Sequence, residues 1–198
     1  MVDIETTGLD ARRDEVISFA AVPVEGARIV VAGAVAGLVR PELPPPPRTV
    51  EIHGLRPSDL VQAPPAAEAL PRLAAAMNGR IPVVHSAAVE RSFLAPGLRA
   101  LGFRWPRRVV DTALLWRLLC LLRGDGDPGT APLAMVASAL GLPVHRPHEA
   151  PGDALTTAQA FLALATHLEA HGRGTVRALA SARWYVRGWR LLRGSEAA

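Results

Sequence analysis

The stretch VDIETTGLD, residues 2–10, sets two acidic residues on either side of an isoleucine. Alternate side chains of a strand share one face, so Asp3 and Glu5 are expected to point the same way, about 7 Å apart along the strand. Two unpaired carboxylates on one face repel each other unless a cation or solvent lies between them. The stretch therefore predicts a strand that ends near Gly8 and brings acidic ligands to a cation.

The composition predicts one domain with a short appendage. Of the 198 residues, 49% are hydrophobic, which is enough for a sizeable core. All 22 basic residues are arginine, and the net charge of +4 agrees with an anionic partner such as nucleic acid. The single Cys120 excludes a disulfide within the chain. No apolar run reaches the roughly 18–20 residues that span a bilayer, and no signal-peptide pattern opens the chain, so we expect a cytoplasmic protein without stable membrane insertion.

Short apolar runs follow the first strand and alternate with helical patterns. Residues 15–26 and 27–41 predict two more strands of an antiparallel meander, and the proline-rich stretch 41–48 predicts a stiff connector. Further along, the patterns predict a helix start at Ser58 and Asp59, a buried strand within 81–86, a strand followed by a helix within 107–124, and helices at 66–77, 87–101, 131–141 and 152–172. This order indicates a mixed α/β sheet flanked by helices.

Four acids and a histidine stand out as a candidate site although they are far apart in the sequence. The acids are Asp3 and Glu5 on the first strand, Glu90 on a helix, and Asp153 near the start of the last long helix. Carboxylate oxygens from several elements are suitable ligands for Mg²⁺ or Mn²⁺. His148 lies five residues before Asp153, and a neutral histidine beside such a site can take a proton from an attacking water.

Four motifs in this order, VDIETTGLD, HSAAVERSFL, VVDTALL and HEAPGDA, resemble those of the DEDDh-type, DnaQ-like 3′–5′ exonucleases. This family includes the proofreading subunit of bacterial DNA polymerase III. The resemblance covers roughly residues 1–165. It implies an RNase H-like fold with a mixed five-stranded sheet, two Mg²⁺ or Mn²⁺ ions, and release of nucleoside monophosphates from single-stranded or frayed 3′ ends. DNA is the favoured substrate, although a member of the family that trims RNA would show the same motifs. It also implies that a polymerase or repair protein is a partner.

The resemblance assigns roles to particular residues. It implies that Asp3, Glu5, Glu90 and Asp153 are metal ligands and that His148 is the general base. It further implies a substrate-binding role for the residues after the first acids and for the segment EIHGLRPSDL, namely Thr6, Thr7, Gly8, Leu9, His53, Gly54 and Leu55.

Two departures from the family pattern favour an alternative. The second motif usually carries aspartate where this chain has Glu90, and the extra methylene displaces the carboxylate by about an ångström, a shift that can cost about 100-fold in rate. The family also has several apolar residues before the first aspartate, so we expect either a misassigned start or a fragment with a weakened central strand. The alternative function is a catalytically weakened relative that binds 3′ ends or a protein partner without cutting.

The remaining features receive structural interpretations. Asp111 is predicted to cap a helix, and His85 is predicted to support a strand end. Residues 1–170 are expected to form the exonuclease domain and residues 171–198 a basic, aromatic tail with Trp184, Tyr185 and Trp189. The tail could grip nucleic acid or a membrane surface, or it could pack its aromatic side chains onto the domain.

Overall fold

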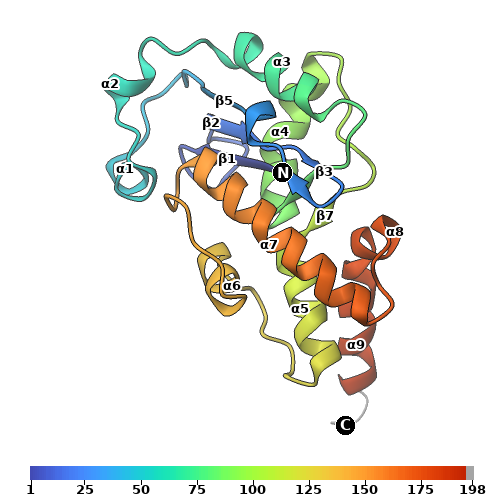
Figure 1. The fold of residues 1–198 in the computed structure, drawn as a ribbon. Helices are drawn as coiled ribbons and strands as arrows, with labels where there is room; N and C mark the ends of the chain where they lie inside the picture. Colours follow the sequence, from blue (N-terminus) through green and yellow to red (C-terminus); the bar gives the residue numbers. More distant parts are fainter. Residues whose placement is uncertain (195–198) are drawn as a thin grey trace.

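A three-stranded sheet and a two-stranded sheet lie side by side at the centre of the molecule (Figure 1). The computed structural model describes residues 1–194, and side chains as far as residue 188. Three strands are antiparallel in the order β1-β2-β5, and β6 pairs in parallel with β7 while lying beside β1. The strands are β1 (Val2–Thr6), β2 (Val16–Ala21), β5 (Val35–Leu38), β6 (Val83–Val84) and β7 (Val110–Asp111). This arrangement confirms the mixed α/β architecture and the antiparallel pairing of the first strands, while β6 and β7 form a separate hydrogen-bonded pair beside β1 instead of completing one five-stranded sheet.

Helices cover both faces of the sheet. One face packs against α3 and α4, and the other packs against α7, which in turn contacts α5 and α6 (Figure 1). These helices are α3 (Ala66–Met77), α4 (Ala87–Ala100), α5 (Thr112–Arg123), α6 (Leu133–Ala139) and α7 (Ala150–Ala170). Successive side chains of β1 point to opposite faces of the sheet, and Val2 and Ile4 point into the core on the α3–α4 side. Asp3 and Glu5 are therefore left to face α7.

The third predicted strand, residues 27–41, is not continuous. Its first part forms β4 (Arg28–Ile29), which pairs with β3 (Val24–Glu25) as a hairpin, and a 3₁₀ turn at Val31–Gly33 precedes β5. Breaking the run lets β5 return to the edge of β2. Gly37 is needed there, because a Cβ at this position would lie 2.8 Å from the ring of Phe19. Apolar composition alone gave no sign of the break.

The proline-rich connector ends earlier than predicted, since a helix begins inside it. Pro47 occupies the first turn of α1 (Pro47–His53), where its missing N–H leaves no hydrogen bond unmade. The short helix α2 (Pro57–Leu60) follows, at the predicted helix start. The helix α1 was missed because four consecutive prolines are typical of an extended connector.

The C-terminal segment packs on the domain through small apolar residues. Helix α8 (Val176–Ala180) precedes α9 (Ala182–Gly194), which runs beside α5 (Figure 1). Leu179, Ala182 and Val186 are buried in the core. The interpretation that the tail packs its aromatic rings onto the domain is wrong for Trp184, which is 60% exposed on the side of the helix opposite Ala182 and Val186. Tyr185 lies at the edge of that stripe, is 40% exposed and is partly covered by the Arg173 guanidinium. The side chain of Trp189 and residues 195–198 lie outside the described part.

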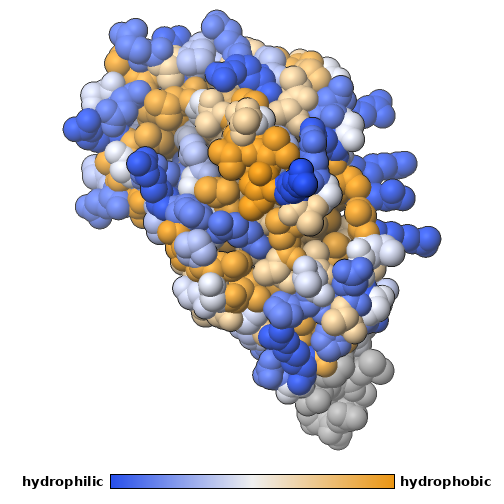
Figure 2. Space-filling model, in the orientation of Figure 1, coloured by the Kyte–Doolittle hydropathy of each residue, from blue (hydrophilic) through white to orange (hydrophobic). Residues whose placement is uncertain are grey.

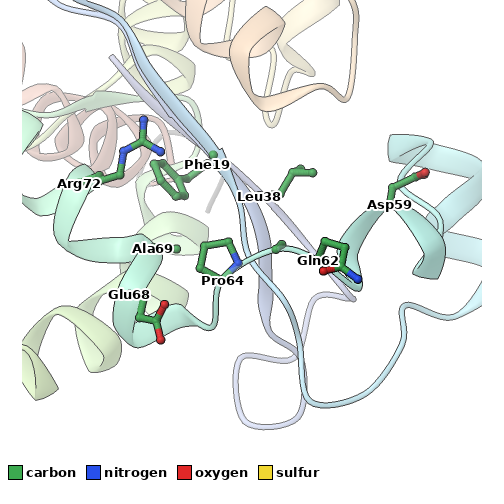
Figure 3. A pocket seen from close by; sticks show the side chains of 10 residues that line it. Phe19, Leu38, Asp59, Gln62, Pro64, Glu68, Ala69 and Arg72 are labelled. Carbon is green, nitrogen blue, oxygen red and sulfur yellow. The ribbon is translucent and has the colours of Figure 1, made fainter.

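Two surface hollows lie away from the acids of the candidate site. One, of about 390 Å³, lies between β5 and the segment from α2 to α3, where Phe19, Leu38 and Pro64 line it (Figure 3). The other, of about 430 Å³, has apolar walls that include Met1, Val22 and Phe161. An apolar surface is visible in Figure 2 around the place where Figure 1 shows the N-terminus and β3. None of the helices in the described residues is both long and apolar enough to cross a membrane.

Candidate functional site

Three of the predicted acids meet where β1 approaches the first turn of α7. Asp3, Glu5 and Asp153 each offer a carboxylate oxygen, and these oxygens lie within 4.8 Å of one another. Asp3 and Glu5 share a face of β1, as the strand period predicts, while Asp153 comes from the opposing helix. The packing of α7 on the sheet thus brings together acids that lie about 150 residues apart in the sequence.

Close backbone packing fixes the start of α7. A Cβ at Gly152 would lie 2.2 Å from the carbonyl oxygen of His145 and 2.6 Å from that of Arg146, so only glycine fits there. His148 has a φ of 62°, and its backbone N–H donates to Asp153 Oδ2 at 2.9 Å. The loop before α7 therefore orients the Asp153 carboxylate through the backbone of His148.

Glu90 lies close to the cluster without joining it. Its side chain is only 4% exposed, and Oε2 has no hydrogen-bond partner. Its charge helps to raise the pKa of Asp3, so the two carboxylates are neighbours. The structure thus brings three of the four predicted acids close enough to bind a single ion and leaves Glu90 outside that group.

The first turn of α4, which carries Glu90, is held by Asp111. The carboxylate of Asp111 accepts hydrogen bonds from the N–H groups of Ala113 and Leu114 in α5, and also from those of Ser86 and Ala87 at the start of α4, over 2.9–3.3 Å. The predicted cap is confirmed, and the structure adds that one carboxylate joins two helix starts. Sequence gave no signal for the second helix, because residues 86 and 111 are distant along the chain.

His85 supports the end of β6. Its Nδ1 lies 2.9 Å from Thr112 Oγ1, and its Nε2 lies 2.9 Å from the carbonyl oxygen of Ala131. Burial lowers the pKa of His85, which favours a neutral ring with its proton on Nε2, facing that carbonyl. Both ring nitrogens are engaged, as expected for a structural histidine.

Burial and mutual repulsion make the acids of this region hard to ionise. Burial raises the pKa of Asp3 well above its usual range, and the charges of Asp153, Glu90 and Glu5 add to that effect. Burial and Asp153 raise the pKa of Glu5 to about 8, and burial followed by Asp111 raises that of Glu90 to about 8. The pKa of Asp153 also rises through burial, although the hydrogen bond from His148 N–H opposes the rise.

This donor set fits a hard divalent cation. The ligands are oxygens from two elements, and the buried, unpartnered Oε2 of Glu90 is a further acceptor nearby. Several negative groups in one partly buried place are unfavourable by themselves and become favourable when a cation neutralises them. Asp3, Glu5 and Asp153 are thus the residues that could hold a metal ion.

The two histidines assigned to catalysis and substrate lie near each other. His148 is exposed, and its charge contributes, after burial, to the lowered pKa of His53. His53 is buried at the end of α1, where Nδ1 accepts a hydrogen bond from Leu55 N–H at 3.0 Å and Nε2 has no partner. Gly54 ends α1 with a φ of 73°, and Leu55 is partly buried.

The loop after β1 combines a fixed base with an exposed tip. Thr7 is buried, its hydroxyl donates to Asp14 Oδ1 at 3.2 Å, and it accepts from Glu15 N–H at 3.0 Å. A Cβ at Gly8 would lie 2.4 Å from the Asp14 carboxylate, which explains the glycine. Leu9 is 87% exposed at the tip. Thr6 turns its hydroxyl onto the carbonyl of Gly8 at 2.6 Å. The role of Asp14 in holding this loop was missed by sequence reasoning.

Comparisons with known sequences agree on a family. Residues 1–161 match the model of the RNase_T family, described as exonuclease. DNA polymerase III PolC-type from Thermotoga maritima is 33% identical over 82% of this chain, and a DNA polymerase III subunit epsilon-like protein from Rhodobacter capsulatus is 30% identical over 89%. The chain spans only 11% and 25% of the length of these two relatives.

Solved structures share the fold. Exonuclease X in complex with 5′ overhanging duplex DNA matches 91% of this chain and 96% of its own, with a TM-score of 0.70 and 23% identity. Exonuclease I of E. coli in complex with a dT13 oligonucleotide matches 85% of this chain and 41% of its own, with a TM-score of 0.72 and 16% identity. Both likenesses confirm an exonuclease-type RNase H-like fold.

Proposed function

The chain belongs to the RNase_T exonuclease family, and we propose that it is a metal-dependent 3′–5′ exonuclease that acts on single-stranded or frayed ends and releases nucleoside monophosphates. The observation that carries the proposal is the group of Asp3, Glu5 and Asp153, with oxygens within 4.8 Å of one another. DNA is favoured over RNA because two structural neighbours are named as complexes with DNA.

Each residue of the site has a separate role in this proposal. Asp3, Glu5 and Asp153 would hold Mg²⁺ or Mn²⁺, with Glu90 as a further ligand on the α4 side. When bound, two such ions would supply the Lewis acidity that lowers the pKa of a water and stabilises the leaving 3′ oxygen. His148, exposed beside Asp153, accepts the proton of that water on its imidazole.

The terminal nucleotide is assigned to the rim of the site. Leu9 offers an exposed apolar side chain for a base or sugar, and the turn at His53, Gly54 and Leu55 lies near His148. Thr6, Thr7 and Gly8 shape the loop that carries Leu9. The polymerase names of the relatives make a polymerase or repair protein a suitable partner to deliver the 3′ end.

Digestion of a 5′-labelled single-stranded oligonucleotide in Mg²⁺ or Mn²⁺ tests the proposal. A ladder that shortens from the 3′ end is expected, and Asp3→Asn should abolish it because the variant loses a ligand charge. Asp125→Asn removes an exposed acid after α5 and serves as the matched control. A ladder that persists in Asp3→Asn, or degradation from the 5′ end, would contradict the proposal.

A second candidate, a weakened relative that binds ends without cutting, is favoured by one observation. Glu90 stands outside the group formed by the other three acids. Glu90→Asp shortens the side chain by one methylene and should raise the cleavage rate if the length of Glu90 limits catalysis. Binding of 3′ ends in EDTA, together with no cleavage by either the native chain or Glu90→Asp, would establish the binding protein instead.

A further inference from the structure

The positive charge of this chain is concentrated near its C-terminal end. Residues 1–170 hold 16 arginines and 17 acidic residues, so the part that carries the candidate site is close to neutral. Residues 171–194 hold six arginines and no acidic residue. The net charge of +4 therefore comes from one short segment, which is the arrangement expected of a polyanion-binding surface.

The fold turns this charge outward. Leu179 of α8 and Ala182 and Val186 of α9 are buried against the core that includes Leu115 and Leu119 of α5. The basic residues Arg177, Arg183 and Arg187 are exposed on the remaining surface, together with Trp184 and Tyr185. We call these five exposed residues, with Arg173, the C-terminal basic surface.

Arginines stack on both exposed rings. The Arg173 guanidinium lies 3.7 Å from the centre of the Tyr185 ring, and that of Arg183 lies 4.9 Å from the centre of the Trp184 ring. The nearby Glu169, in the last turn of α7, lies against Gly174 and offsets part of the charge. Guanidinium groups that alternate with aromatic rings can bind phosphates and stack with unpaired bases at the same time.

The burial pattern separates nucleic acid from a lipid surface. A helix that binds in a membrane interface keeps its apolar side free for the acyl chains. In the part of α9 whose side chains the structure describes, Ala182 and Val186 are already packed against the core, and the exposed rings are flanked by arginines. We infer that the C-terminal basic surface binds single-stranded nucleic acid, as a contact separate from the carboxylate cluster.

The position of the surface suits a strand that also reaches the candidate site. Arg173 N–H donates to the Leu168 carbonyl at 2.9 Å, so this surface adjoins the C-terminal end of α7, whereas Asp153 lies at the start of that helix. The 15 helical residues between Asp153 and Leu168 rise about 22 Å. A stacked strand with a rise of about 3.4 Å per nucleotide needs about six or seven nucleotides to cover that length. The inference that one strand reaches both the C-terminal basic surface and the carboxylate cluster rests on the proposed function.

Fluorescence anisotropy of the full chain with a labelled oligothymidylate of about 20 nucleotides, in EDTA at several salt concentrations, tests the inference. The double variant Arg183→Gln with Arg187→Gln should weaken binding about tenfold or more, and the slope of log affinity against log salt should fall by about 1.4 if both contact phosphates. Arg99→Gln with Arg104→Gln removes the same charge from exposed positions at and after the end of α4 and should leave the affinity nearly unchanged.

Further variants separate charge from stacking. Arg183→Lys with Arg187→Lys keeps the charge and should retain most of the affinity, while Trp184→Ala should weaken binding about tenfold without changing the salt slope. Equal losses in the two Gln double variants, or native affinity in Arg183→Gln with Arg187→Gln, would overturn the inference. Tighter binding to anionic lipid vesicles than to the oligonucleotide would overturn it in favour of a membrane surface.

Cleavage assays distinguish this inference from the proposed function. If the chain cuts, the ratio of kcat/KM for a long strand to kcat/KM for a tetranucleotide should be smaller in Arg183→Gln with Arg187→Gln than in the native chain. If the chain does not cut, loss of oligonucleotide binding in that variant still supports the C-terminal basic surface while the exonuclease proposal fails.

Discussion

The two ends of α7 carry opposite chemistry in opposite surroundings. At its start, Asp153 joins Asp3 and Glu5 in a partly buried group whose pKa values are raised. At its other end, arginines and aromatic rings are exposed. Burial strengthens the interactions between the charges at the first end, so a substitution there has a large effect. Solvent weakens each charge interaction at the second end. Function at the first end should depend on single atoms, and function at the second on the sum of several side chains.

The largest effect is expected from Asp153→Asn. The cleavage rate should fall by more than about 100-fold, because a charged oxygen is lost from the cluster. Mutation of a residue that only supports a metal ligand typically costs up to that factor. The same change removes a charge that repels Asp3 and Glu5, so at about pH 8 in EDTA the variant should be more stable than the native chain. Nuclease assays and thermal unfolding on one preparation measure both. A variant that is both inactive and less stable in EDTA would contradict the repulsion.

The stability of the metal-free protein should depend on pH. The folded-state pKa values of Glu5 and Glu90 are raised to about 8, so the native state holds more protons than the unfolded state between about pH 4.5 and pH 8. Stability should therefore fall as the pH rises through that window, lowering Tm in EDTA by at least about 5 °C. Mn²⁺ at pH 8 should restore it. A Tm that is flat across this range would show that the acids are not coupled to folding.

A pair of glycine substitutions compares the packing at the two ends. Gly152→Ala should destabilise the fold by about 1–3 kcal/mol, because the new Cβ meets the carbonyl oxygens of His145 and Arg146. Gly188→Ala, in α9, meets no atom within 4 Å and should stabilise by up to about 1 kcal/mol through helix propensity. Urea unfolding of both variants measures the difference. Equal effects would mean that the start of α7 is less tightly packed than the structure indicates.

The smallest effect concerns the stacked pair at the exposed end. Tyr185→Leu removes the ring beneath Arg173 and should lower the free energy of unfolding by about 0.5–1 kcal/mol. Urea unfolding detects this loss, and Arg173→Gln should produce a similar one. A loss of several kcal/mol would show that this surface is part of the core rather than an exposed binding surface.

Local patterns predicted most of the fold. The helix at residues 66–77 matches α3, and the helix at 87–101 matches α4 within one residue, because apolar periodicity and the Asn78 and Gly102 end signals are local. The strand 27–41 was wrong in its continuity and α1 was missed, since both depend on what the chain packs against. Local signals do not report a long-range requirement such as the contact between Gly37 and Phe19.

The candidate site was only partly predictable. The period of a strand placed Asp3 and Glu5 together, but only the packing of α7 brings Asp153 to them. Glu90 lies outside the group, on the first turn of α4, whose start Asp111 fixes through the N–H groups of Ser86 and Ala87. The burial of Ala182 and Val186 and the exposure of Trp184 were not predictable, because sequence alone did not say which face of α9 would be covered.

Asp111 has a further consequence for the environment of the site. Both of its carboxylate oxygens accept hydrogen bonds from backbone N–H groups, so it has little capacity left to coordinate an ion. Its charge nevertheless acts on Glu90, the neighbour of the cluster, since it helps to raise the pKa of that carboxyl. Asp111 thus acts as a fixed source of negative potential, which concentrates cations around the carboxylates without competing with them for coordination.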